Sequence, residues 1–158
     1  MIKILIVEDE TIVALDTQST LIKLGYEVTD IVTTYEEALL SFSKNKPDII
    51  LMDIFLKNSL SGIDIAKKIN ENSNTAIIFM SAYCDDETLD KAAKIEPFAY
   101  LVKPFNRNDL KSSMNIATYK LQKRSEKIDE NGKYKLSHEY YYFLEPYLKV
   151  YFKNQEID

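Results

Sequence analysis

The sequence contains three acidic side chains, one hydroxyl and one amine that each follow a short apolar run. Three carboxylates held close together repel one another strongly, so a site built from them needs a cation. Oxygen ligands favour a hard metal, and Mg²⁺ commonly takes one or two carboxylates, several waters and a substrate phosphate. An aspartate can also accept a phosphoryl group as an acyl phosphate, while a metal ion and an ammonium group neutralise the phosphoryl oxygens. The five residues are Glu8, Asp9, Asp53, Ser81 and Lys103.

These residues share one site only if the apolar runs before them are strands of the same sheet. The runs are rich in Ile, Val, Leu and Phe, and three are nearly continuous in apolar character, which is typical of strands buried on both faces of a parallel sheet. The second run is more polar, which favours an edge strand. We therefore predict strands at residues 2–7, 27–32, 48–52, 76–80 and 98–102.

Amphipathic segments follow the predicted strands, so a strand–helix unit repeats five times. Right-handed crossovers place such helices on both faces of one parallel sheet. The pattern predicts an α/β fold with a flavodoxin-like (βα)5 doubly wound sheet in the order 2-1-3-4-5. In this order the carboxyl ends of the first and third strands flank the ligand crevice. Helices are expected at residues 11–24, 35–43, 63–69, 87–95 and 109–124.

Local signals mark several element ends. Gly25 suits the position after the first helix, and Thr33 and Thr34 are candidate N-caps of the second. Lys103-Pro104 is a candidate cis peptide in a turn that would aim the ammonium group into the crevice.

Each of these five candidate site residues also has an ordinary structural interpretation. An acidic pair such as Glu8-Asp9 is usually a solvated turn or a helix cap, and Asp53 or Ser81 could cap the following helix. Lys103 could be a surface lysine. Their joint placement at four different strand ends favours a shared site over four separate coincidences.

Four motifs, taken in order and with their spacing, resemble the response-regulator receiver family: EDE, LMDI, MSA and YLVKPF. The resemblance covers residues 1 to about 124. It implies a receiver that accepts a phosphoryl group on Asp53 from a sensor histidine kinase, with Mg²⁺ as cofactor. The implied metal ligands, direct or through water, are Glu8, Asp9, Asp53 and the carbonyl of Phe55. The implied phosphoryl contacts are Ser81 and Lys103, and the implied switch aromatic is Tyr100, which could otherwise be a half-buried strand residue.

The resemblance also implies how such a chain acts. Phosphorylation changes the face formed by the fourth helix, fifth strand and fifth helix, and this face is a candidate homodimer surface. Catalysis is limited to self-directed phosphotransfer and autophosphatase activity, so we do not expect a conventional enzyme.

The loop after Asp53 departs from the family pattern. It reads FLKNSLSG where the family often has Met-Pro-Gly-Met, so it lacks proline and is one residue longer. Phe55 and Tyr83 stand two residues after Asp53 and Ser81, at positions that tune autodephosphorylation in the family. Two bulky aromatics there predict a long-lived phosphoryl state.

The character of the chain changes after the predicted fifth helix. Residues 125–133 are charged and turn-prone, which predicts a linker, and residues 134–158 are rich in tyrosine and predict a short β-rich extension. The extension weakly resembles the opening of a winged-helix DNA-binding output domain, which favours regulation of transcription. DNA would then be bound only through output-domain elements that this chain lacks. The alternative is a stand-alone receiver that acts by protein–protein interaction without DNA binding.

The composition argues against several classes of protein and several cellular locations. The net charge of −5 argues against nucleic-acid binding over the whole surface. One cysteine, Cys84, excludes an internal disulfide framework, and the N-terminus lacks the long apolar region of a signal peptide. No membrane segment is expected, and the location is expected to be cytoplasmic. The single histidine, His138, makes Ser-His-Asp hydrolysis and His-rich zinc sites poor alternatives.

Overall fold

The computed structural model describes residues 1–57, 59–71, 73, 75–82 and 85–126. The predicted β-rich extension therefore lies outside the described residues, as do Tyr83, Cys84 and His138. The chain divides into two compact units, Met1–Ala117 and Thr118–Asp158. The features below belong to the first unit except where the fifth helix continues past Ala117.

Five parallel strands form one sheet in the order β2-β1-β3-β4-β5, as the sequence predicts. The more polar strand β2 lies at an edge, which confirms its predicted position. The central strands β1, β3 and β4 are almost wholly buried, as their apolar sequences require. The strands are β1 (Lys3–Val7), β2 (Glu27–Val32), β3 (Ile49–Asp53), β4 (Ala76–Ser81) and β5 (Ala99–Val102).

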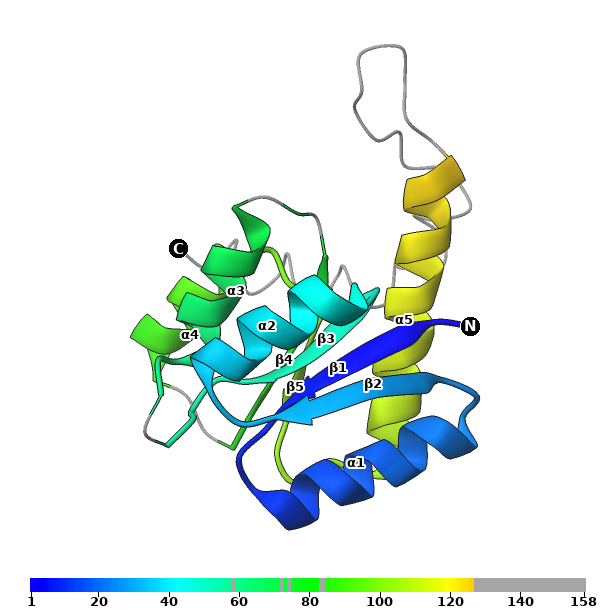
Figure 1. Cartoon of the computed structure of the whole chain (residues 1–158), viewed down its shortest axis with the longest axis horizontal. Coiled ribbons are helices and arrows are strands. Elements are labelled where there is room, and N and C mark those ends of the chain that lie inside the picture. The colour runs from blue at the N-terminus through cyan, green and yellow to red at the C-terminus, as the bar shows by residue number, and fades with distance from the viewer. Residues whose placement is uncertain (58, 72, 74, 83–84, 127–158) are drawn as a thin grey trace. The chain divides into compact units, whose positions relative to one another are not determined.

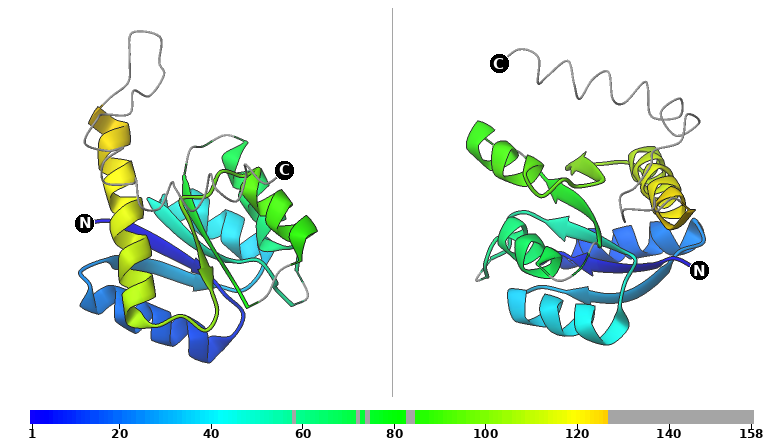
Figure 2. Two further views of the ribbon diagram at one scale, coloured as in Figure 1. Left: turned by 180° about the vertical axis from the view of Figure 1, so that it is seen from behind. Right: turned by 90° about the horizontal axis from the view of Figure 1, so that it is seen from above.

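Each strand leads into a helix, and the helices cover both faces of the sheet (Figures 1 and 2). The buried faces of α2 and α3 pack on the same hydrophobic cluster as Leu5, Val7 and Phe79 of the sheet. The helices are α1 (Thr11–Lys23), α2 (Tyr35–Asn45), α3 (Gly62–Asn70), α4 (Asp86–Ala93) and α5 (Arg107–Glu126). Within the described residues, no helix has the length and apolar character needed to cross a bilayer.

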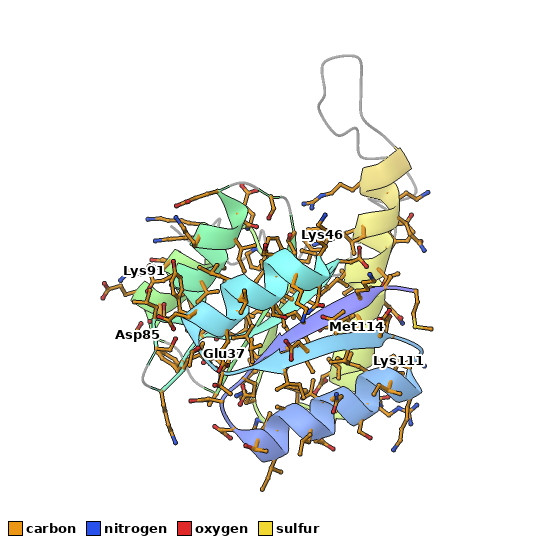
Figure 3. All side chains as sticks on the ribbon, viewed as in Figure 1. Glu37, Lys46, Asp85, Lys91, Lys111 and Met114 are labelled. Carbon is orange, nitrogen blue, oxygen red and sulfur yellow. The ribbon has the colours of Figure 1, made fainter. Side chains whose placement is uncertain are left out.

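Side-chain caps set where several helices begin. Thr34, Ser61 and Asp85 each accept a hydrogen bond from a backbone amide three residues ahead, at the starts of α2, α3 and α4. In Figure 3, Glu37 lies near the start of α2 and Lys46 just past its end. Asn106 and Asp109 exchange two hydrogen bonds, so α5 begins at Arg107 rather than at the expected residue 109.

Gly25 ends α1 as predicted. Its φ of +95° lies in the left-handed region, and its amide donates to the carbonyl of Ile22.

The strand register brings the carboxyl ends of the strands to one edge of the sheet. Val7 pairs with Met52, and Asp53 pairs with Met80. Ser81 pairs with Val102. Because parallel strands all end at this edge, the residues that terminate β1, β3, β4 and β5 are neighbours.

Candidate functional site

Backbone hydrogen bonds and strand pairing hold the strand-end residues in place. The amide of Glu8, directly after β1, donates to the carbonyl of Val32 in β2 at 3.0 Å. Asp53 and Ser81 are the last residues of β3 and β4. The amide of Lys103 donates to the carbonyl of Ser81 at 2.7 Å, and the Lys103-Pro104 peptide is cis, as the sequence suggested.

The ammonium group of Lys103 joins two of the three acids. It donates to both carboxylate oxygens of Glu8 at 2.8 Å and to Oδ2 of Asp53 at 3.0 Å. The lysine side chain is only 13% exposed. Lys103 is therefore not the surface lysine of the ordinary interpretation, and its charge is directed into the crevice.

The third acid completes a cluster with the composition of a metal site. Glu8, Asp9 and Asp53 each present one carboxylate oxygen, and these atoms lie within 4.8 Å of one another. Glu8 and Asp53 are buried, while Asp9 is half-buried at the rim. When all are ionised, the three carboxylates and the one ammonium leave two negative charges. An all-oxygen donor set with this charge fits a hard divalent cation such as Mg²⁺.

Burial and crowding shift the proton affinities of this cluster. Burial, together with the hydrogen bond to Asp53 and the charge of Asp53, raises the pKa of Glu8 from 4.5 to about 8, against the opposing effect of Lys103. Burial acts to lower the pKa of Lys103, but the hydrogen bonds to Glu8 and Asp53 and the negative charges of these two acids together raise that pKa. Because the pKa of Glu8 is raised, a proton on this carboxyl competes with any cation that binds at the cluster.

The loop between β3 and α3 supplies backbone contacts that sequence reasoning missed. The amide of Phe55 donates to Oδ1 of Asp53 at 3.1 Å, and the amide of Lys57 donates to Oδ2 of Asp9 at 2.7 Å. The amide of Gly62, the first residue of α3, donates to the carbonyl of Ile54 at 2.8 Å and closes the loop. Every residue except proline has a backbone amide, so the sequence does not mark these contacts. The family resemblance pointed to this loop only through the carbonyl of Phe55.

The remaining predicted residues are Ser81, Tyr100 and Phe55. Ser81 is buried at the end of β4 and does not cap α4, because Asp85 does. Tyr100 in β5 is half-buried, packs against the hydrophobic cluster and pairs in register with Phe79. Phe55 directly follows the buried pair Asp53 and Ile54, and 54% of it is exposed.

The chain is similar in sequence to known proteins over the part that forms the sheet. Residues 4–115 match the family model of the response regulator receiver domain. The chain is 32% identical over 114 residues to chemotaxis protein CheY of Thermotoga maritima, which covers 72% of this chain and 94% of that protein. It is 30% identical over 115 residues to transcriptional regulatory protein PdtaR of Mycobacterium tuberculosis, covering 73% of this chain.

Solved structures of receiver domains have a fold similar to that of this chain. The signal receiver domain of a modulated diguanylate cyclase from Desulfovibrio desulfuricans has a TM-score of 0.71 and 35% identity, with 76% of this chain and 95% of that chain covered. The chain nevertheless spans only about half the length of several curated relatives, including 56% of PdtaR.

Proposed function

The chain belongs to the response regulator receiver family of two-component signalling, and from that premise we propose that it is a phosphorylation switch with Asp53 as the acceptor. Members of this family are phosphoacceptor modules that interact with histidine kinases and are not conventional enzymes. The observation that supports the proposal most directly is the ammonium group of Lys103, which bonds to Asp53 and Glu8 together within a cluster that Asp9 completes.

The proposed reaction transfers a phosphoryl group from a phosphohistidine of a sensor kinase. A carboxylate oxygen of Asp53 attacks phosphorus, the P–O bond forms, the P–N bond breaks and the imidazole leaves. The amide of Phe55 at 3.1 Å from Oδ1 orients the acceptor carboxylate. Lys103 and the hydroxyl of Ser81 then take phosphoryl oxygens as partners.

Glu8, Asp9, Asp53 and the carbonyl of Phe55 would hold Mg²⁺, which when bound supplies charge neutralisation for the phosphoryl oxygens. The donor set fits this ion because every donor is oxygen and two of the three acids are buried.

Phosphorylation would act by shifting an equilibrium between two states, so the phosphoryl group must interact more favourably with one of them. Movement of Ser81 toward the phosphoryl would open space for Tyr100 to turn inward, and the face of α4, β5 and α5 would change with it. A homodimer through this face is part of the proposal. A long-lived phosphoryl state, inferred from Phe55 and Tyr83, remains a prediction.

Regulation of transcription is the output we favour, since a relative carries the name of transcriptional regulatory protein. We place the receiver at residues 1–124, a linker at 125–133 and the extension or output fragment at 134–158, in the cytoplasm. A stand-alone receiver that acts through protein contacts is the alternative, since CheY matches along nearly its whole length. A gel-shift assay with the full gene product separates the two, because the alternative predicts no DNA binding in either phosphorylation state.

The acceptor is tested with acetyl phosphate and Mg²⁺, followed by intact-mass analysis. The unaltered chain should gain the mass of one phosphoryl group, and Asp53→Asn should gain none. Asp16→Asn is the matched control, because Asp16 is exposed on α1 and should leave the gain unchanged. A mass gain that survives Asp53→Asn would place the acceptor elsewhere.

A further inference from the structure

The carboxylate of Asp9 is held by a backbone amide that lies 48 positions away in the sequence. The N–H of Lys57 donates to Oδ2 of Asp9 over 2.7 Å, which is short for a bond between an amide and a carboxylate. Lys103 bonds to the other two acids, and among the described residues the amide of Lys57 is the hydrogen-bond donor found for the side chain of Asp9. We infer that this N–H positions Asp9 and thereby sets the affinity of the cluster for Mg²⁺, an inference that rests on the proposed function.

The amide can hold Asp9 because the loop that carries it is itself anchored. Leu56, directly before Lys57, is 8% exposed and belongs to the hydrophobic cluster. The far end of the loop is tied by the amide of Gly62 to the carbonyl of Ile54. In between, the hydroxyl of Ser59 accepts from the amide of Tyr35 at 2.8 Å, which ties the loop to the start of α2.

The bond leaves Asp9 free to bind a cation. A carboxylate has two oxygens and about four lone-pair sites, and the amide uses one of them. Asp9 still presents an oxygen within 4.8 Å of those of Glu8 and Asp53. A hydrogen bond that restrains a ligand carboxylate reduces the ordering that metal binding requires, and loss of such a partner typically weakens a metal site by about 10-fold to 100-fold.

The nature of the donor makes the inference testable at one position. The N–H belongs to the backbone, so any residue except proline at position 57 retains it. This loop lacks the proline that is frequent in the family, and Lys57→Pro would remove the donor. Lys57→Ala removes the exposed lysine side chain and retains the N–H, so it is the matched control.

Mg²⁺ titration by calorimetry on the full chain is the first measurement. We expect Lys57→Pro to raise the dissociation constant about 10-fold and Lys57→Ala to change it by less than about 2-fold. Equal affinity in Lys57→Pro and the unaltered chain would overturn the inference. So would an equal weakening in Lys57→Ala, because the side chain rather than the amide would then be responsible.

Amide NMR on metal-free protein provides a readout that does not depend on the folding of Lys57→Pro. The Lys57 resonance should shift upfield and lose protection from hydrogen exchange in Asp9→Ala, and an unchanged Lys57 resonance would overturn the inference. Failure of the unaltered chain to bind Mg²⁺ or to accept a phosphoryl group would instead overturn the proposed function, and with it the role given to Lys57. Mg²⁺ binding that is indifferent to the amide would overturn the positioning role alone.

Discussion

Replacement of Gly62 by alanine tests whether α3 must start in direct contact with β3, the strand that ends in Asp53. A Cβ at this position would lie 2.0 Å from the carbonyl oxygen of Asp53 and 2.8 Å from Cγ of Met52. Favourable contacts between heavy atoms lie near 3.5–4.0 Å, so a methyl group must move away from Asp53 by more than about 1 Å. The obstacle is backbone inside a buried strand and cannot rotate aside.

The size of the effect follows from two opposing contributions. Overpacking of this kind costs about 1–3 kcal/mol, and the upper end applies because backbone must shift. Alanine is a better helix former than glycine by up to ~1 kcal/mol. The free energy of unfolding should therefore fall by about 2 kcal/mol, which corresponds to a decrease in Tm of roughly 8 °C. Because the displaced atom belongs to Asp53, acetyl phosphate should also phosphorylate this variant more slowly.

Urea unfolding followed by circular dichroism measures the first effect, with Gly25→Ala as the comparison. No atom lies within 4 Å of a Cβ at Gly25, so the cost there comes from its φ of +95° alone. Gly25→Asn should recover part of that cost, since asparagine tolerates the left-handed region, and Gly62→Asn should recover nothing. Gly25→Ala should leave the phosphorylation rate unchanged. A Gly62→Ala variant within about 0.5 kcal/mol of the unaltered chain would refute the reasoning.

Three further outcomes are expected. The pKa of Glu8 is about 8, so a proton on this carboxyl competes with Mg²⁺ below that pH. The affinity for Mg²⁺ should therefore rise by up to about tenfold per pH unit below about pH 8 and level off above it. Calorimetric titrations across this pH range measure the dependence, which Glu8→Gln should abolish. Lys103→Met removes the positive partner of Asp53, so the rate of phosphorylation, measured by intact mass, should fall by ~100-fold. The dissociation constant for Mg²⁺ should not increase, and an unchanged rate of phosphorylation would contradict the role of the ammonium group. Lys46 caps α2 with a φ of 48°, so Lys46→Gly should raise the free energy of unfolding by roughly 1 kcal/mol in urea titrations, and a decrease would contradict this.

The sheet order and the acidic cluster were predictable because both depend on patterns that the chain repeats. The buried strands β1, β3 and β4 are almost entirely apolar, which marks them as central, and parallel connectivity then brings their carboxyl ends together. Glu8, Asp9 and Asp53 followed from that arrangement without any knowledge of side-chain direction.

The contacts made by the β3–α3 loop were not predictable in the same way. A backbone N–H looks the same in every residue except proline, so the bond from Lys57 to Asp9 leaves no mark on the sequence beyond the absence of proline. The contact of Gly62 with Asp53 is likewise invisible, since a glycine after Ser61 suits a helix start for reasons of its own. The direction of Lys103, by contrast, was predicted from the Lys103-Pro104 turn after β5, and not from the alternation of strands and helices.

The partners of Lys103 determine how a change at Asp53 would reach the rest of the fold. Its ammonium group contacts Glu8 and Asp53, so a phosphoryl group on Asp53 must compete for that ammonium or draw it along. Its amide donates to the carbonyl of Ser81 at 2.7 Å, which ties the end of β4 to the residue that follows β5. Tyr100 stands in β5 three residues before Lys103 and packs on the hydrophobic cluster. We expect a change of charge at Asp53 to reach this half-buried ring through a short path of covalent and hydrogen bonds, with an exchange of partners at Lys103 as the first step.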